Sequence, residues 1–335
     1  MIQLYPDNFY SDSNTKSEFE NAYISKVKVN SQKMKDLIVD CETGLKTLSS
    51  LYRGRYFPQT FDELLIISPK YISEIYLYAK NDKSFENEIA RLFKPNGNFL
   101  LDYDYYSYRI IRFFIDEEKK NKFSINTCVY CNRTYINTFL LENETSKQQY
   151  DLDHFIPKGE CALFAFSLYN LIPSCQACNS KIKGSNVKYD DLSPEELEKL
   201  FPSSKNYDYS SCLKFRLFPT LCKGSYKFPC FRYSEHNNNF KIEFERTKNF
   251  TSASMYENKE AESFCIKARY EHHNREFLNH VDKHIKYPAS FFMMMTKATK
   301  WNPSDLYESL FSSNLRNEEK MIFQKIYNDL DDIFD

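Results

Sequence analysis

The residues whose types are best suited to carry out a reaction lie in the stretch DLDHFIPKG, residues 151–159. An acid, Asp153, stands directly before a histidine, His154, and a Pro-Lys-Gly sequence typical of a turn follows. The alternation of polar and apolar residues predicts a strand with Asp151 and Asp153 on one face and His154 on the other. Because the strand ends at the turn, we expect the acid and the histidine near an exposed end. Carboxylates bind hard cations and imidazoles exchange protons near neutral pH, so these residue types suit metal or acid–base chemistry.

Two pairs of cysteines flank this stretch, and each pair has a two-residue gap: Cys128 and Cys131 in CVYC, and Cys175 and Cys178 in CQAC. This spacing lets a tight turn direct two thiolates at one ion. Two such pairs complete the tetrahedral coordination of a structural Zn²⁺ and leave no position for substrate. No thioredoxin-like βαβ pattern surrounds either pair, which argues against a redox site. We therefore predict a structural zinc site, with two unrelated reduced pairs as the alternative.

The other cysteines have no paired spacing and are expected to be buried, as small hydrophobic side chains. They are Cys41, Cys161, Cys212, Cys222, Cys230 and Cys265.

The segment between the cysteine pairs predicts two strands and a helix. After the first strand, Asn170 lies in the apolar run LYNLIPSC, which predicts a second strand. Asn179 follows in CNSKIKG, which predicts one or two helical turns ended by Gly184. A strand, a loop, a strand and a helix, joined by zinc, make a ββα unit.

These residues together resemble the HNH (ββα-metal) endonuclease family. The sequence DH, then Asn170, then CNxxK, between two CxxC pairs, is similar to the family's motif over about residues 128–184. Many members have a histidine where this chain has Asn179, a variant that also occurs in active members and predicts looser, more metal-dependent ligation. The acid–histidine pair is intact, so we expect an active enzyme.

The resemblance implies a role for each motif residue. His154 is similar to the family's general base, which takes a proton from water. Asp153 and Asn179 are similar to the ligands of one catalytic divalent ion, and their hard oxygens suit Mg²⁺ or Mn²⁺. Asn170 matches the middle position, which braces the loop and holds the orientation of the imidazole.

Positive charge near the motif is expected to meet phosphate. Two lysines, Lys181 and Lys183, follow Asn179 closely, and Lys158 lies in the turn after the histidine. Lys181 could also contact the scissile group. The alternative for each lysine is an ordinary solvated position. Asp151 is a candidate for a further ligand or for a residue that supports the ligands.

Composition excludes several other function classes. The chain has 335 residues with only 6 Gly, and it contains neither GxGxxG nor GxxxxGK[ST], which argues against an ATPase or a dinucleotide enzyme. The formal net charge is -1, so nucleic-acid binding requires a local basic patch, a metal or a partner.

No apolar stretch approaches the roughly 18 residues of a membrane span, and the first residues lack the features of a signal peptide. We expect a soluble cytoplasmic protein without a membrane partner.

The segments around the motif are predicted to be mainly helical. Apolar periodicity predicts helices over residues 1–120, with Thr60 and Ser84 as helix N-caps, and further helices over 191–335 with a strand or hairpin near 205–250. The expected fold class is α+β and mainly helical. A central zinc-stapled ββα-metal nuclease unit, residues 121–190, stands between helical N- and C-terminal arms.

Three further features lie outside the motif. His273, His280 and His284 share one helix face, and without HExxH they favour a basic, solvated or DNA-facing side over a second metal site. The aromatic run YDYYSY, 103–108, favours a core stripe over base stacking. Residues 241–300 carry an excess of basic residues and are the best large candidate for phosphate contacts.

The leading function is a metal-dependent DNA endonuclease that acts on double-stranded DNA with little base readout. An HNH unit in a helical chain without its own ATPase is similar to effector nucleases of bacterial antiphage systems, such as the HNH partner of Septu-type systems, which pairs with an ABC-like ATPase. A restriction or mobile-element nuclease is the alternative within this class. A non-catalytic zinc-stapled nucleic-acid-binding module and an RNA-cleaving HNH nuclease stay open as other functions.

Overall fold

The computed structural model describes most of the chain, in the ranges 2–5, 7–119, 126–140, 146–183, 188–219, 240–247, 250–311 and 322–331. It divides into two compact units. The first, which we call the motif unit, comprises Gln3–Val129 and Ile136–Asp208. The second, the C-terminal unit, comprises Met1–Ile2, Tyr130–Tyr135 and Tyr209–Asp335.

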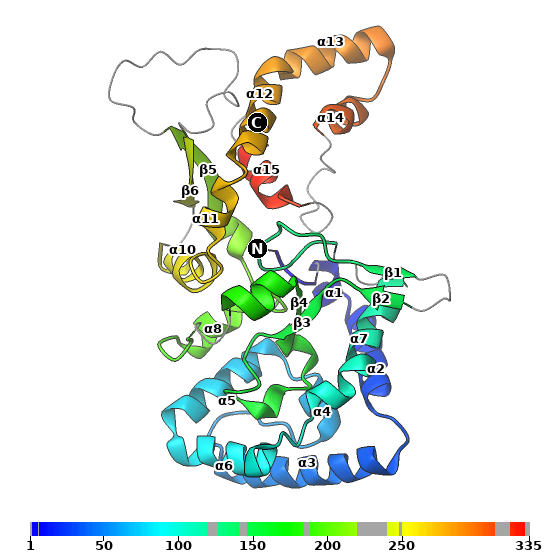
Figure 1. The fold of residues 1–335 in the computed structure, drawn as a ribbon, viewed down its shortest axis with the longest axis vertical. Helices are drawn as coiled ribbons and strands as arrows, with labels where there is room; N and C mark the ends of the chain where they lie inside the picture. The colour runs from blue at the N-terminus through cyan, green and yellow to red at the C-terminus, as the bar shows by residue number, and fades with distance from the viewer. Residues whose placement is uncertain are drawn as a thin grey trace. The chain divides into compact units, whose positions relative to one another are not determined.

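The predicted fold class is confirmed at the level of secondary structure, because the described residues are α+β and mostly helical (Figure 1). They form three antiparallel sheets of two strands each. No helix among them is both long and apolar enough to cross a membrane.

The motif unit is built from eight described α-helices, four short strands and several single-turn helical segments. The helices are α1 (Asp7–Ser11), α2 (Ser13–Val27), α3 (Gln32–Leu51), α4 (Phe61–Leu65), α5 (Pro69–Asn81), α6 (Lys83–Phe93), α7 (Tyr103–Lys119) and α8 (Pro194–Leu200). The strands are β1 (Thr138–Leu140), β2 (Ser146–Gln148), β3 (Asp151–His154) and β4 (Leu171–Ser174), and the other helical segments are η1 (Pro95–Gly97), η2 (Ala162–Phe164), η3 (Leu168–Asn170) and η4 (Ala177–Lys183). Helix α2 packs against α7, and α6 packs against α3 and α5 (Figure 1).

Local capping explains where several of these helices begin. Thr60 caps α4 and Ser193 caps α8, each through a capping box, as the sequence predicts for Thr60. The predicted cap at Ser84 is wrong. Asp82 caps α6 instead, because its carboxylate accepts hydrogen bonds from the backbone N–H groups of Ser84 and Phe85. A side-chain cap of this kind contributes about 1 kcal/mol to helix stability.

Buried hydroxyl groups connect the N-terminal helices to the segment that carries the motif. The Tyr23 hydroxyl donates to the backbone carbonyl of Phe166 (2.6 Å), and the Tyr169 hydroxyl donates to the carboxylate of Glu20 (2.6 Å). Tyr23 and Tyr169 are almost fully buried, so these bonds accompany the burial of large aromatic rings. The helices α1–α7 and the segment that carries the motif therefore belong to one compact unit.

Helix α7 shows why the aromatic run YDYYSY divides between core and surface. Tyr103 and Tyr106 are buried, whereas Tyr105 is 60% exposed and Tyr108 is 72% exposed. Residues three apart share a helix face, while their neighbours point elsewhere. The predicted core stripe is thus confirmed for two of the four tyrosines and wrong for the other two.

The cysteines outside the two pairs follow the prediction except for one. Those buried in the described residues are Cys41, Cys161 and Cys212. Cys265 is exposed, which corrects the prediction, because it occupies a left-handed turn position (φ 50°) directly before α11 (Ile266–Glu271). Cys222 and Cys230 lie outside the described residues.

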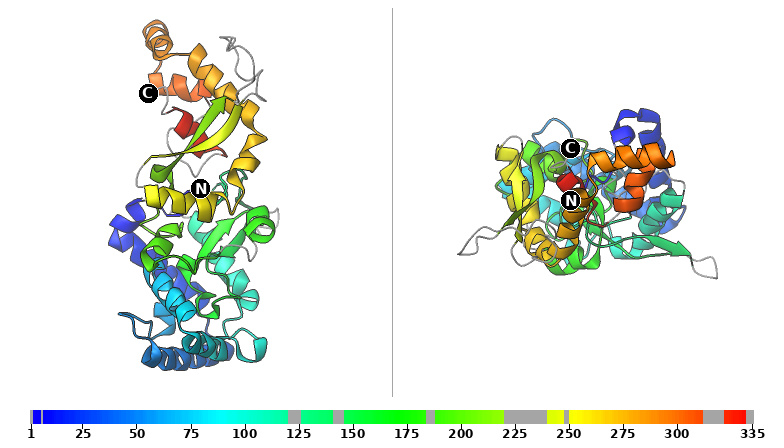
Figure 2. Two further views of the ribbon diagram at one scale, coloured as in Figure 1. Left: turned by 90° about the vertical axis from the view of Figure 1, so that its left-hand side faces the viewer. Right: turned by 90° about the horizontal axis from the view of Figure 1, so that it is seen from above.

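The C-terminal unit combines one strand pair with helices. Strands β5 (Leu213–Pro219) and β6 (Phe240–Arg246) pair antiparallel, in agreement with the strands predicted near 205–250. Its helical elements are α9 (Tyr209–Cys212), α10 (Phe250–Tyr256), η6 (Glu257–Ala261), α11, α12 (Asn274–Lys286), α13 (Ala289–Thr299), α14 (Pro303–Phe311) and α15 (Gln324–Asp331). Helix α15 (red in Figure 2) lies beside β5.

Candidate functional site

The predicted order of strand, loop, strand and helix is present in the motif unit. Strand β3 pairs antiparallel with β4, so that Asp151 lies opposite Ser174 and His154 lies opposite Leu171 (Figure 1). The helical segment η4 follows β4 after a short connection that contains Cys175. This arrangement places the polar residues of β3 close to the residues of η4.

The four paired cysteines come together as a cluster. The sulfur atoms of Cys128, Cys131, Cys175 and Cys178 all lie within 4.8 Å of one another, and all four side chains are buried. The backbone N–H of Cys175 also donates a hydrogen bond to the sulfur of Cys128 (3.3 Å), a contact that suits a thiolate. Four converging buried thiols have the chemistry and number of ligands of a structural zinc site. These residues could therefore hold a metal ion such as zinc, at the turn between β4 and η4.

The imidazole of His154 is held in one orientation. Its Nε2 atom lies 2.9 Å from the backbone carbonyl oxygen of Ala165, and its ring meets the ring of Tyr103 edge-on at 4.6 Å. Because a carbonyl oxygen only accepts, Nε2 carries the hydrogen and Nδ1 is the atom that can accept a proton. Desolvation lowers the pKa of His154 to about 4, so the imidazole is neutral at pH 7.

Asn170 ties together the two ends of the loop between β3 and β4. Its Oδ1 accepts a hydrogen bond from the backbone N–H of Ile156 (2.8 Å), and its Nδ2 donates to the carbonyls of Ile156 and Phe164 (both 3.1 Å). Asn170 is fully buried, so losing these bonds would leave buried backbone groups unpaired. Since Phe164 precedes Ala165, this network also fixes the carbonyl that holds His154.

Asp153 forms a buried ion pair with Lys183. The Lys183 ammonium donates to Oδ2 of Asp153, to the carbonyl of His154 (2.7 Å) and to the carbonyl of Phe155 (3.1 Å). Asp153 is 7% exposed and Lys183 is 2% exposed. Burial lowers the pKa of Lys183, and the neighbouring Asp153 opposes that effect. Lys183 therefore does not face solvent as a phosphate contact requires, which corrects that prediction: its charge is directed at Asp153.

Asn179 contacts the other carboxylate of the strand. Its Nδ2 atom donates to Oδ2 of Asp151 (3.2 Å). This contact presents the amide nitrogen of Asn179, rather than its oxygen, to the carboxylate of Asp151. Since Lys183 bonds to Oδ2 of Asp153, ligation by that residue would require Oδ1. Asp151 therefore contacts Asn179, whereas Asp153 contacts Lys183.

The other two predicted lysines lie nearer the surface. Lys158 donates to the carboxylate of Asp104 (2.8 Å), and its side chain is 29% exposed. Lys181 is exposed on η4. Of the three lysines, these two remain predicted phosphate contacts.

Sequence reasoning missed the contribution of α7 to this site. Tyr103 and Asp104 begin this helix and contact His154 and Lys158, from about fifty positions earlier in the chain. The aromatic run marked α7 as amphipathic, but no local pattern connects it with β3.

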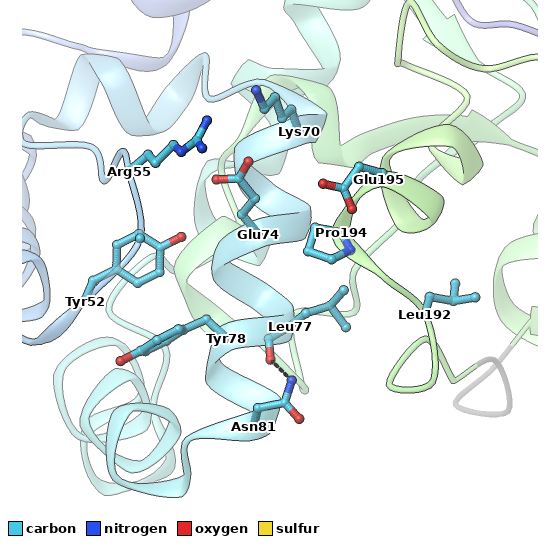
Figure 3. A pocket seen from close by; sticks show the side chains of 11 residues that line it. Tyr52, Arg55, Lys70, Glu74, Leu77, Tyr78, Asn81, Leu192, Pro194 and Glu195 are labelled. Atoms are coloured by element: carbon cyan, nitrogen blue, oxygen red, sulfur yellow. Dashed lines mark hydrogen bonds between the residues drawn. The ribbon is translucent and has the colours of Figure 1, made fainter.

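A separate cleft of about 540 Å³ lies between α5 and the start of α8 (Figure 3). Its polar lining includes Arg55, Lys70, Glu74 and Glu195. No residue of the predicted site lines it, so the cleft adds nothing to the geometry around His154.

Comparison with known proteins adds no relative, since no family model, no curated protein and no solved structure matches this chain.

Proposed function

We propose that this chain is a metal-dependent endonuclease of the HNH type that hydrolyses phosphodiester bonds of DNA. One observation carries the proposal: a neutral imidazole, His154, has its Nε2 held by the Ala165 carbonyl and its Nδ1 left as a proton acceptor, directly after Asp153. An unprotonated imidazole that is held in place can accept a proton from water, although its lowered pKa makes it a weaker base than one that titrates near the working pH.

The residues around His154 support this role. When Nδ1 takes a proton from water, the Ala165 carbonyl still accepts from Nε2–H and stabilises the imidazolium that forms. Asp153, Asn179 and Asp151 would hold Mg²⁺ or Mn²⁺, and a bound divalent ion would stabilise the negative charge that develops on the phosphate. Lys181 and Lys158 are proposed to meet the phosphate backbone.

Two further residues are proposed to position this machinery. Lys183 fixes the carboxylate of Asp153 through Oδ2, and Asn170 fixes the loop that carries the Ala165 carbonyl. The four cysteines would hold a structural zinc ion at the turn that leads into η4. None of these groups needs to touch the substrate.

The proposed substrate is double-stranded DNA, and the proposed setting is cytoplasmic antiphage defence beside an ABC-like ATPase. The formal net charge of -1 supports this setting, because an enzyme without a strong overall positive charge gains DNA affinity from a partner. Sequence specificity would then come from the helical parts of the chain or from the partner.

The buried ion pair of Asp153 with Lys183 favours a second candidate function. A carboxylate that is neutralised by an internal ammonium could serve only the fold. In that case the chain would be a zinc-stapled nucleic-acid-binding module without catalysis.

Cleavage assays separate these functions. We expect the purified chain to nick supercoiled plasmid in Mg²⁺ or Mn²⁺ and not in EDTA, and to leave RNA of matched length intact. The variant His154→Ala should lower the cleavage rate by about 100- to 10,000-fold, because it removes the general base. His272→Ala, an exposed histidine outside the site, is the matched control and should cleave at the wild-type rate.

Each other outcome rejects a defined part of the proposal. Cleavage that resists EDTA would exclude the divalent ion, and equal rates for both histidine variants would exclude His154 as the base. Cleavage of RNA but not of DNA would mean that the substrate is RNA. Binding of DNA without cleavage, even with the partner ATPase present, would favour the non-catalytic module.

A further inference from the structure

A second group of metal-ligand side chains lies in the C-terminal unit, far along the sequence from the motif. Helix α12 carries His280 and His284 one turn apart, and Asp331 at the end of α15 meets both of them. The Nε2 atoms of His280 and His284 lie 2.5 Å and 2.7 Å from the same carboxylate oxygen, Oδ1 of Asp331. The two Nε2 atoms lie 3.3 Å from each other. Three ligand atoms from two helices therefore converge on one point.

Two shared hydrogen bonds and a bound cation are the two ways in which these three atoms can be satisfied. In a neutral imidazole, Nε2 either donates or accepts. His280 and His284 can both donate to Oδ1 of Asp331, which accepts through two lone pairs. A cation among the three atoms would take the place of these two protons, because each of the three atoms can direct a lone pair at it.

The spacing suits a zinc ion. Two nitrogens bound at about 2.0–2.1 Å to a tetrahedral Zn²⁺ stand about 3.3–3.4 Å apart, which is the separation of the two Nε2 atoms. Oδ1 of Asp331 lies 2.5 Å and 2.7 Å from the two nitrogens, well inside the separation of about 3.3 Å between tetrahedral zinc ligands, so the carboxylate would have to move away from the imidazoles when the ion binds. Two imidazoles and one carboxylate are the ligands that Zn²⁺ takes in sites with an open fourth position, and this nitrogen-rich set is not one that Mg²⁺ prefers.

The surroundings cover most of the two imidazoles and orient the carboxylate. The side chains of His280 and His284 are 5% and 10% exposed. The rings of Phe311 and Tyr327 pack against the two imidazoles at 4.3 Å and 4.6 Å. The Tyr307 hydroxyl donates to the other oxygen of Asp331, Oδ2 (3.0 Å), as outer partners of a metal ligand commonly do.

We propose that His280, His284 and Asp331 bind one zinc ion, and that this ion fastens α15 to α12. The site uses none of the residues of the proposed nuclease centre or of the cysteine cluster. It also explains why two histidines, expected on a solvated or DNA-facing helix side, are instead buried (His280) or nearly so (His284).

Metal analysis of the full chain tests this site. We expect the purified wild-type protein, dialysed against a weak chelator, to hold one zinc ion more than the four cysteines account for. His284→Gln and Asp331→Asn should each lose that one ion, while His272→Gln, the exposed control, should keep it. Mass spectrometry of the metal content gives the number of zinc ions per chain.

Cobalt substitution assigns the ion to its ligands. A Co²⁺ ion bound by cysteine thiolates absorbs strongly through sulfur-to-metal charge transfer, and a Co²⁺ ion bound by nitrogen and oxygen does not. We expect the charge-transfer bands to be equal in wild type and His284→Gln, and the weaker visible bands of a nitrogen–oxygen site to disappear in the variant. If the wild-type protein takes up metal at thiolates alone, the proposal is wrong, whether or not either variant folds.

Discussion

Replacing Cys175 by serine is expected to remove the zinc ion from the cysteine cluster and to lower the free energy of unfolding by about 5 kcal/mol or more. A structural zinc ion contributes about 10–16 kcal/mol of apparent binding free energy, which is as large as the whole stability of an ordinary domain. Cys175 lies directly after β4, and Cys178 lies within η4. Loss of the ion therefore releases the turn that places Asn179 against β3.

A second buried cysteine provides the matched control. Cys161 is 3% exposed and Cys175 is 5% exposed, but only Cys175 belongs to the cluster. Cys161→Ser makes the same chemical change at a similar depth and should keep its zinc, at the smaller cost of burying a hydroxyl group. Zinc content and the midpoint of urea unfolding measure both effects. Full zinc occupancy in Cys175→Ser would mean that the cluster does not hold the ion.

The second large effect is expected at Lys183. Lys183→Met keeps the length of the side chain and removes the ammonium, which leaves the carboxylate of Asp153 buried without its partner. Breaking a buried ion pair from one side costs about 3–5 kcal/mol. We therefore expect a large fall in the urea midpoint, together with loss of cleavage because the orientation of Asp153 is no longer fixed.

The variant Lys181→Met is the control that distinguishes loss of the ion pair with Asp153 from a general effect of removing one positive charge. Lys181 lies two positions earlier on the same segment and is exposed, so its replacement should change stability by no more than about 0.5 kcal/mol. The double variant Lys183→Met with Asp153→Asn should recover part of the lost stability, since it removes the unpaired charge. Equal stability of the two single lysine variants would show that the pair with Asp153 does not form.

The sequence was most informative where a pattern is local. The CxxC spacing predicted the cluster that the structure assembles, and the alternation in DLDH predicted the strand that pairs with Leu171–Ser174. Both depend on fixed short-range geometry, namely a tight turn in one case and a two-residue period in the other. The capping box at Thr60 likewise depends on residues close together in the sequence.

The sequence was least informative where two distant side chains compete for one partner. Nothing local distinguishes Lys183 from Lys181, yet the packing of η4 on β3 directs one ammonium at Asp153 and leaves the other at the surface. The same limit applies to Asp331, which meets His280 and His284 only through the packing of α15. Such pairings follow from tertiary contacts and leave no short-range pattern.

The dependence of DNA cleavage on Mn²⁺ concentration tests the proposed nuclease centre most directly, with the wild-type chain compared with Asn179→Ala and Ser180→Ala. Asn179 is proposed to bind the catalytic ion, whereas Ser180 is its exposed neighbour. We predict that Asn179→Ala needs at least about 10-fold more Mn²⁺ for half-maximal cleavage, as loss of a ligand weakens metal binding, and that Ser180→Ala matches the wild type. Identical Mn²⁺ dependence in all three proteins would contradict the account, because the metal would then be bound elsewhere.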